Sequence, residues 1–497
     1  MLILLSRSIR ARSISLHLSR KTTLLLNRSY SHSQTDTLTN VVGDPHDFFR
    51  YTSGRWLWNE EKELEEKYRE FDILGLQNVA VEAASAGPCL KNTLDIPVPR
   101  VLAWNPEIDS TNPVGAEYII MKHAPGEQLA LIWPDMDIDR KIQTMTDIVD
   151  IQQKLLSSTF YPYTADCKSY GCLYFRKDAP PGSHPATIKG GGLSHELKTR
   201  IAEQFSIGPI VDTAYWDKER ADMAIDRGPS WIREHAVPLP PDDPSFLVRN
   251  QYAPAEHSSV IQRYLPVTHH LLPGAKELLG SFLWHPDLHT PNIFIDKCGK
   301  ITSIIDSQST STGPVFLQVR PPNFIDYKSE LILKPPENFE QLDKDSQTLA
   351  LDKTYKSLLL SLYIEQTVEK NPLLSKVLLD PNGTIMTDPI RFSGGTWDGD
   401  ILTLRESLIK VKKKTNQTQR HWDSLNREGK CPLDFSPEEL RKHYEDGDNW
   451  NAGQDFWDDY LSGILGRDCW TSHETYDQAM FVYTELKAIM SDQTQDK

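Results

Sequence analysis

Residues 281–306 decide the fold of this chain, and they read SFLWHPDLHTPNIFIDKCGKITSIID. Two runs of apolar and β-branched residues, Ile293–Ile295 and Ile301–Ile305, lie on either side of a short turn that contains Gly299. Two such runs joined by a glycine-containing turn are typical of a β-hairpin. The sequence therefore predicts a hairpin in this part of the chain.

Three polar side chains flank the predicted hairpin. Asp287 and Asn292 precede its first strand and Asp306 follows its second, so all three would meet at one end. Phosphoryl transfer needs a carboxylate at the attacking hydroxyl and oxygen ligands for Mg²⁺, because the protein supplies positioning and charge neutralisation. The pattern H-x-D-x-x-x-x-N, with an aspartate 14 residues after the asparagine, supplies these groups. It predicts Asp287 as the catalytic base and Asn292 and Asp306 as metal ligands.

A purely structural role for this loop is the alternative. Asp and Asn are natural turn formers, so His285 and Asp287 could cap a turn while Asn292 makes a local contact. We expect His289 to be structural, with its side chain able to hydrogen-bond the loop backbone, since no second histidine at ligand spacing indicates a metal site.

The same residues carry a resemblance. The stretches WHPDLHTPNIF at 284–294 and IIDSQST at 304–310 resemble the aminoglycoside phosphotransferase/choline kinase-like superfamily. More closely, the chain resembles a fungal mitochondrial branch, the altered inheritance of mitochondria protein 9-like proteins. Further stretches that resemble this branch are FRYTSGRWL at 49–57, DIPVPRVL at 95–102, GAEYIIM at 115–121 and DRGP at 226–229.

The resemblance implies a protein kinase-like α+β fold with two lobes. A truncated N-terminal lobe would span 41–122, and a large, mainly helical C-terminal lobe would span 123–497 and hold the catalytic-loop hairpin at 281–310. The segment Ile120, Met121 and Lys122 would form the hinge that contacts adenine. ATP and Mg²⁺ are the implied cofactors, and the implied substrate is a small hydroxyl-bearing molecule whose identity the resemblance does not give.

The expected N-terminal lobe departs from this pattern. In such folds a glycine-rich hairpin covers the phosphates and a cation on a strand grips them. Residues 71–90 contain no Lys or Arg, and their two glycines, Gly75 and Gly87, are isolated. The stretch VAVE at 79–82 is expected to be helical and not a phosphate-gripping strand. Three explanations stay open: a phosphotransferase, a non-catalytic pseudokinase that binds a protein partner or a metabolite, and an exon missing from the gene model.

Residues 1–35 have the composition of a targeting segment. They contain six Arg or Lys, no Asp or Glu, and many Ser and Leu. This composition predicts a mitochondrial transit peptide and a location in the matrix, because a secretory signal would have an uninterrupted apolar core.

Composition excludes several partners. The chain has 54 basic and 69 acidic residues, a formal net charge of −15, so its surface should repel phosphate backbones and we expect no nucleic-acid partner. Its apolar runs are too short to predict a transmembrane segment. The six cysteines include no C-x-x-C pair, which argues against a zinc site or a redox dithiol.

Hydrophobic periodicity predicts the remaining elements. Helices are expected at 58–70, 137–156 and 263–279, around 351–362 and around 401–411. Strands are expected at 101–104 and 116–121, and residues 160–260 are expected to be irregular.

Overall fold

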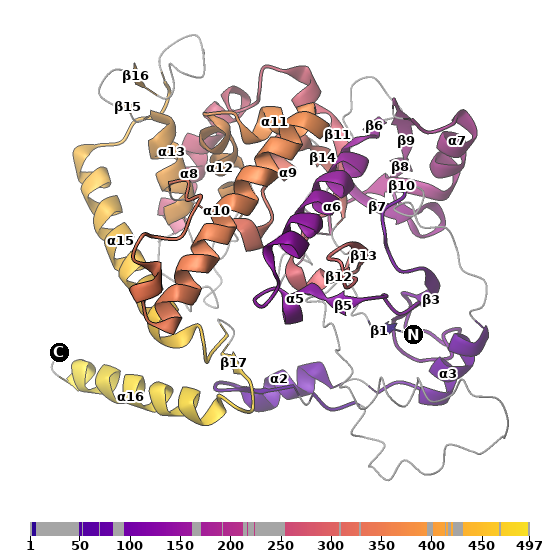
Figure 1. The fold of residues 1–497 in the computed structure, drawn as a ribbon, viewed down its shortest axis with the longest axis horizontal. Helices are drawn as coiled ribbons and strands as arrows, with labels where there is room; N and C mark the ends of the chain where they lie inside the picture. The colour runs from indigo at the N-terminus through magenta and orange to yellow at the C-terminus, as the bar shows by residue number, and fades with distance from the viewer. Residues whose placement is uncertain are drawn as a thin grey trace.

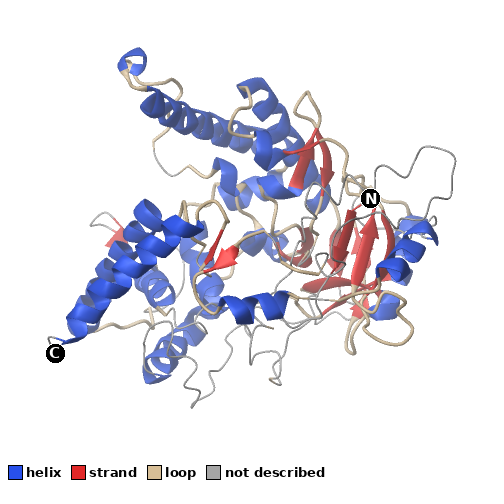
Figure 2. Cartoon of the chain, turned by 90° about the horizontal axis from the view of Figure 1, so that it is seen from below, coloured by secondary structure: helices blue, strands red, loops and turns tan. Residues whose placement is uncertain are grey.

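The structure is a computed structural model. It describes residues 2–5, 49–51, 53–68, 70–82, 94–161, 170–190, 192–211, 216, 223, 254–307, 310–327, 330–394, 401–412, 414–415, 419–420, 431–466 and 469–495. Helices and strands are mixed, as predicted, with the strands gathered toward one side of the molecule and the long helices toward the other (Figure 2).

The predicted hairpin is confirmed. Strands β12 (Ile293–Ile295) and β13 (Ile301–Ile304) are antiparallel, with Ile293 opposite Ile304. The Asp296 carboxylate accepts two amide N–H groups of the turn, at 2.8 and 3.0 Å. Gly299 completes the turn with a φ of 85°, a conformation that favours glycine.

A long helix supports the hairpin from behind. Helix α6 (Ile138–Leu156), predicted from its periodicity, begins at Asp137, whose carboxylate accepts the Arg140 amide at 2.9 Å. It lies beside α10 (Lys344–Lys370) in Figure 1. The apolar face of α6 and the hairpin isoleucines share one core, whose fully buried members include Met145, Ile148, Val149, Ile293 and Ile304. Burial of such side chains is the main stabilising term, so the core fixes the hairpin on the helix.

An extended stretch also packs on this core. Leu94 and Ile96 are buried among the residues of α6 and the hairpin. The Pro97 carbonyl accepts the Ile304 amide at 2.7 Å, and Lys154 of α6 donates to both the carbonyl and the carboxylate of Asp95. The segment before the small sheet is therefore anchored on the C-terminal part of the chain.

A small antiparallel sheet follows this stretch. Strand β4 (Tyr118–Met121) lies between β3 (Val101–Asn105) and β1 (Leu2–Leu5). Helix α3 (Ile73–Glu82) covers it, so the helix expected at 79–82 is confirmed. The predicted transit peptide falls mostly outside the described residues; Leu2–Leu5, which belong to it, are a strand.

Glu117, just before β4, is expected to make the stability of the folded protein depend on pH. Its side chain is 4% exposed, and its burial, with Glu107 nearby, raises its pKa from 4.5 to about 7. The folded protein therefore keeps a proton that the unfolded chain loses. We expect the free energy of unfolding to fall by up to about 3 kcal/mol as the pH rises from about 4.5 to above 7. Urea unfolding of Glu117→Gln across this range should show a stability advantage that grows with pH; a constant difference would contradict the prediction.

A seven-stranded sheet lies beside the small sheet, and the sequence did not predict it. Its strand order is β8-β10-β7-β14-β11-β6-β9. The expectation that 160–260 is irregular is therefore wrong in part, since five of these strands and α7 (His195–Gln204) fall there. The bounds are β6 (Thr159–Tyr161), β7 (Gly171–Phe175), β8 (His184–Pro185), β9 (Thr187–Lys189), β10 (Phe205–Gly208), β11 (Ser281–Trp284) and β14 (Ser311–Pro314). Strands this short carry little periodicity.

One predicted helix is correct only in part. Residues 263–279 form no continuous α-helix: α8 (Pro254–Tyr264) ends near their start, and two short 3₁₀ helices, Leu265–His270 and Lys276–Leu279, follow. Pro266, Pro273 and Gly274 interrupt the pattern, because proline removes a backbone donor and glycine weakens a helix.

The other elements complete the C-terminal part. The α-helices are α5 (Leu129–Ile132), α9 (Val315–Gln318), α11 (Pro372–Leu378), α12 (Gly383–Ser393), α13 (Leu402–Lys412), α15 (Pro437–Phe456) and α16 (Tyr476–Gln495). Near the N-terminus, β2 (Arg55–Trp56) and α2 (Glu60–Lys67) lie beside β17 (Trp470–Thr471). Among the described helices, none combines the length and the apolar character that crossing a membrane requires.

Candidate active site

The candidate site lies on the loop between β11 and β12. Its backbone is tightly turned: the His289 amide donates to the Asp287 carbonyl at 3.1 Å, and the Asn292 amide donates to the His289 carbonyl at 3.0 Å. Pro291 stands in the first turn of the 3₁₀ segment Thr290–Asn292, where its fixed φ suits the turn. The loop therefore holds Asp287, His289 and Asn292 close together.

Asn292 is the centre of this group and is 5% exposed. Its Nδ2 lies 3.0 Å from the Asp287 carbonyl oxygen, 3.2 Å from Asp287 Oδ2 and 3.2 Å from His289 Nε2. The amide has two hydrogens for these three neighbours. His289 Nε2 also lies 3.1 Å from Asp287 Oδ1, and an ionised carboxylate only accepts.

When Asp287 is ionised, the numbers of donors and acceptors in this group determine which atoms carry the hydrogens. His289 Nε2 must carry a hydrogen to donate to Asp287 Oδ1, so it cannot accept one from Asn292. The two amide hydrogens of Asn292 then go to the carbonyl and the carboxylate of Asp287. The Asn292 side-chain oxygen remains free to act as an acceptor or a metal ligand.

Asp306 comes to the same end of the hairpin. The Ile305 amide donates to the Asn292 carbonyl at 2.9 Å, so the β12–β13 ladder continues one step past the strands. Asp306 follows with a φ of 56°, in the left-handed region that Asp and Asn adopt more readily than most residues other than glycine. The hairpin register therefore brings the backbone at Asp306 next to Asn292, and the joint role predicted for Asp287, Asn292 and Asp306 stays a prediction.

The donors at this end suit Mg²⁺ in part. An amide oxygen and a carboxylate are hard oxygen ligands, and Mg²⁺ is usually held by one or two carboxylates together with substrate phosphates and water. The described residues include no group of three or more His, Cys, Asp or Glu side chains that could hold a metal by themselves. The residues therefore fit a magnesium ion whose coordination is completed by a phosphorylated ligand.

The two histidines of the loop have different surroundings. His285 is 4% exposed, and its Nδ1 accepts the Asp287 amide at 3.3 Å, which orients the loop. The His289 side chain contacts the Asp287 carboxylate. These contacts agree with a structural role for His289, although its partners are side chains of the loop where the sequence suggested the loop backbone.

The predicted hinge residues lie at the end of β4. The side chains of Ile120 and Met121 are buried, and that of Lys122 is exposed. The Lys122 amide donates to the Arg100 carbonyl at 2.9 Å, so this donor is already engaged. Contact of this segment with adenine stays a prediction.

The residues that join the segment after β4 to the candidate site were not predicted from the sequence. Strand β5 (Glu127–Gln128) pairs with β12, and the Gln128 side chain donates to the Pro291 carbonyl at 2.7 Å. At Gly126, with a φ of 96°, a Cβ would lie 2.4 Å from the Ile295 carbonyl oxygen, so only glycine fits this approach. In the sequence, the proline and glycine that precede β5 indicate only a turn. The contact itself could not be predicted, because Gln128 is 163 residues from its partner Pro291.

Similar proteins are found in fungi. No family model matches the chain. A subtelomeric hrmA-associated cluster protein of Aspergillus fumigatus is 28% identical over 421 residues, which cover 73% of this chain and 76% of that protein. Proteins called altered inheritance of mitochondria protein 9, mitochondrial, are 23% identical over 395 residues in Saccharomyces cerevisiae and 25% identical over 400 residues in Lachancea thermotolerans. Those alignments cover 71% of this chain and 60% and 61% of the two yeast proteins.

Among solved structures, the chain is similar to a thermostable mutant of aminoglycoside phosphotransferase APH(4)-Ia in its apo form. The two are 13% identical, and the alignment covers 67% of this chain and 83% of that one with a TM-score of 0.23. A TM-score this low does not establish a common fold.

Proposed function

We propose that this protein is a mitochondrial, kinase-like phosphotransferase that uses ATP and Mg²⁺ to phosphorylate a small hydroxyl-bearing molecule. The observation that carries the proposal is the convergence of Asp287, Asn292 and Asp306 at one end of the β12–β13 hairpin. The mitochondrial location rests on the composition of residues 1–35 and on the names of the yeast relatives.

The order of elements agrees with a two-lobed kinase-like arrangement. The strands β3 and β4 of the small sheet, with helix α3, would be the N-terminal lobe. The segment after β4 leads directly to β5, which pairs with the hairpin, so a hinge here would connect the small sheet to the catalytic loop. The helices and the seven-stranded sheet would form the larger lobe.

Each loop residue then has a defined task. Asp287 accepts the proton of the substrate hydroxyl, while His289 and Asn292 hold its carboxylate in place. Asn292 and Asp306 offer oxygen atoms to Mg²⁺, which when bound with ATP neutralises phosphate charge. His285 fixes the loop through the Asp287 amide.

The metal role of Asp306 is tested by calorimetric titration of the full chain with ATP in millimolar Mg²⁺. We expect saturable, Mg²⁺-dependent binding that Asp306→Ala weakens at least about tenfold, because a charge-assisted contact of this kind contributes more than about 1.4 kcal/mol. Asp448→Ala, which removes an exposed carboxylate of α15, is the control and should bind like the unchanged chain. Absence of binding in a folded, unchanged chain would refute the phosphotransferase proposal.

A pseudokinase is the second candidate, and one observation favours it. Strands β3 and β4, which lie within residues 41–122, contain no Lys or Arg. Residues 71–90 contain no Lys or Arg either, and α3 occupies much of that stretch. Loss of a fixed cation removes a large part of the electrostatic stabilisation of phosphoryl transfer. Binding of nucleotide without any turnover would select this candidate.

A further inference from the structure

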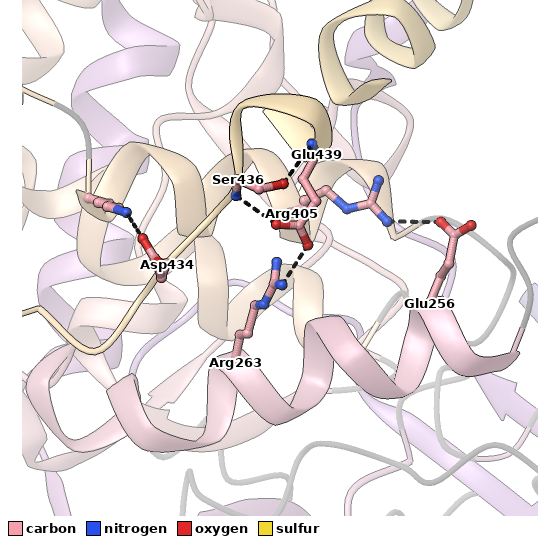
Figure 3. A network of polar contacts seen from close by, with 7 residues as sticks. Glu256, Arg263, Arg405, Asp434, Ser436 and Glu439 are labelled. Carbon is pink, nitrogen blue, oxygen red and sulfur yellow. Dashed lines mark hydrogen bonds and ion pairs between the residues drawn. The ribbon is translucent and has the colours of Figure 1, made fainter. Parts of the chain in front are cut away.

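The first turn of helix α15 forms an ion pair with helix α8 of the large lobe. The Ser436 hydroxyl accepts the Glu439 amide at 3.2 Å, and Glu439 Oε2 accepts the Ser436 amide at 2.7 Å, which is a capping box. Glu439 Oε1 accepts Nη2 of Arg263, on α8, at 2.5 Å. Figure 3 shows this arginine beneath the first turn of α15.

Further polar contacts secure the same face. Lys442 of α15 and Arg405 of α13 both donate to the carboxylate of Glu256, on α8, at 3.0 and 3.2 Å (Figure 3 shows the Arg405 contact). His443, 3% exposed, lies 2.8 Å through its Nε2 from Glu406 of α13. Helix α15 is thus joined to two helices of the large lobe by several charged contacts.

The segment after α15 reaches the other end of the chain. Strand β17 pairs antiparallel with β2, with Trp470 opposite Trp56, and the Leu57 amide donates to the Cys469 carbonyl at 3.0 Å. The Arg55 guanidinium lies 3.7 Å above the Tyr476 ring. Figure 1 shows β17 beside α2.

The N-terminal partner of this pairing is itself connected to the small sheet. The ring centroids of Phe49 and Phe71 are 5.1 Å apart in an edge-to-face contact. The Asp72 amide donates to the Val114 carbonyl at 2.8 Å, and Leu76 of α3 packs with Val114. Contacts among the described residues therefore connect α8 and α13, through α15 and β17, to the small sheet.

We propose that residues 431–466 and 469–476 form a strap that ties the small sheet to the large lobe and limits how far the two separate. The strap has internal bonds of its own: the Thr471 hydroxyl donates to the Ile464 carbonyl at 2.7 Å, and the Gly466 amide donates to the Trp470 carbonyl at 2.6 Å. It is anchored at two separate places, so release of either anchor frees the same motion. This inference does not depend on the proposed phosphotransferase activity.

One substitution separates the first anchor and another weakens the second. At Gly54 a Cβ would lie 2.4 Å from the Thr471 carbonyl oxygen and 2.6 Å from the Trp470 ring, so Gly54→Ala forces β2 and β17 apart. Arg263→Met removes the ion pair with Glu439 at the other anchor and keeps an apolar stem, while the contacts of Lys442 and His443 remain. The matched control is Gly463→Ala, also in the strap, where an added Cβ meets nothing within 4 Å.

The test measures the distance between the two parts of the full-length protein. Spin labels on unnatural amino acids at Val81 of α3 and at Leu379, which are 81% and 56% exposed, report it by pulsed electron resonance. We expect Gly54→Ala to shift the distribution to longer distances, Arg263→Met to shift it less, and the double variant to add nothing beyond Gly54→Ala, because both act on one connection. The control should leave the distribution unchanged.

Two results would overturn the strap: an unchanged distribution in both single variants, or shifts that add in the double variant. Thermal unfolding confirms that each variant is folded before its distances are compared. Should Gly54→Ala fail to fold, Arg55→Met releases the same anchor by removing the contact with Tyr476.

Discussion

Asp287→Ala is expected to slow ATP turnover by a factor of about 10²–10⁴ while the affinity for ATP in the presence of Mg²⁺ stays within about twofold of the unchanged chain. The proposed base contacts the acceptor hydroxyl and not the metal, so its loss affects the chemical step. Asp306→Ala is expected to weaken nucleotide binding itself. The two aspartates, at the same end of one hairpin, should therefore separate into a turnover effect and a binding effect.

The measurement is ADP release with water as the phosphoryl acceptor, beside calorimetric titration of the same samples. Asp448→Ala again serves as the control. Equal losses of turnover and binding in Asp287→Ala would show that this carboxylate acts through the shape of the loop, because it also bonds Asn292 and His289. A thermal midpoint close to that of the unchanged chain excludes general unfolding as the cause.

Gly299→Ala is expected to lower the free energy of unfolding by about 2–5 kcal/mol, as the sum of a left-handed backbone penalty and an overpacking penalty. Gly299 has a φ of 85°, and a Cβ there would lie 2.5 Å from the Arg140 carbonyl oxygen of α6. Backbone atoms cannot rotate away as a side chain can. The hairpin would have to move off the helix, and the site moves with it.

Comparison with Gly182→Ala isolates the steric part of that loss of stability. Gly182 has the same φ of 85°, but an added Cβ there meets nothing within 4 Å. We expect it to cost about 1–2 kcal/mol, the backbone penalty alone. Urea unfolding of both variants gives the difference, which measures the contact of the turn with α6. Equal losses in the two variants would show that this contact is unimportant.

Much of the candidate site could be predicted because it is local in sequence. The hairpin register is set by a short turn, so the spacing of Asp287, Asn292 and Asp306 determines where they meet. Helix α6 was also predictable, since its apolar residues recur with a helical period over 19 residues. What His289 contacts could not be read from spacing, because it depends on side-chain orientation within the loop.

The rest of the fold depends on distant partners. Strands of two to five residues, such as β7 and β10, show no usable alternation, and tertiary pairing decides their structure. The pairing of β2 with β17 joins residues near opposite ends of the chain. No pattern within either segment reveals the other.

The seven-stranded sheet has a consequence for how the protein reaches its folded state. Strand β11, which leads into the catalytic loop, pairs with β6 on one side and β14 on the other, and β14 pairs with β7. The Thr312 hydroxyl donates to the Gly171 carbonyl 141 residues away. Closing loops of this size costs conformational entropy before the hydrogen bonds of the sheet can form and stabilise it. Such non-local topologies fold slowly. The loop that carries Asp287 is therefore expected to gain its shape late, only after residues as far along the chain as 314 have joined the sheet.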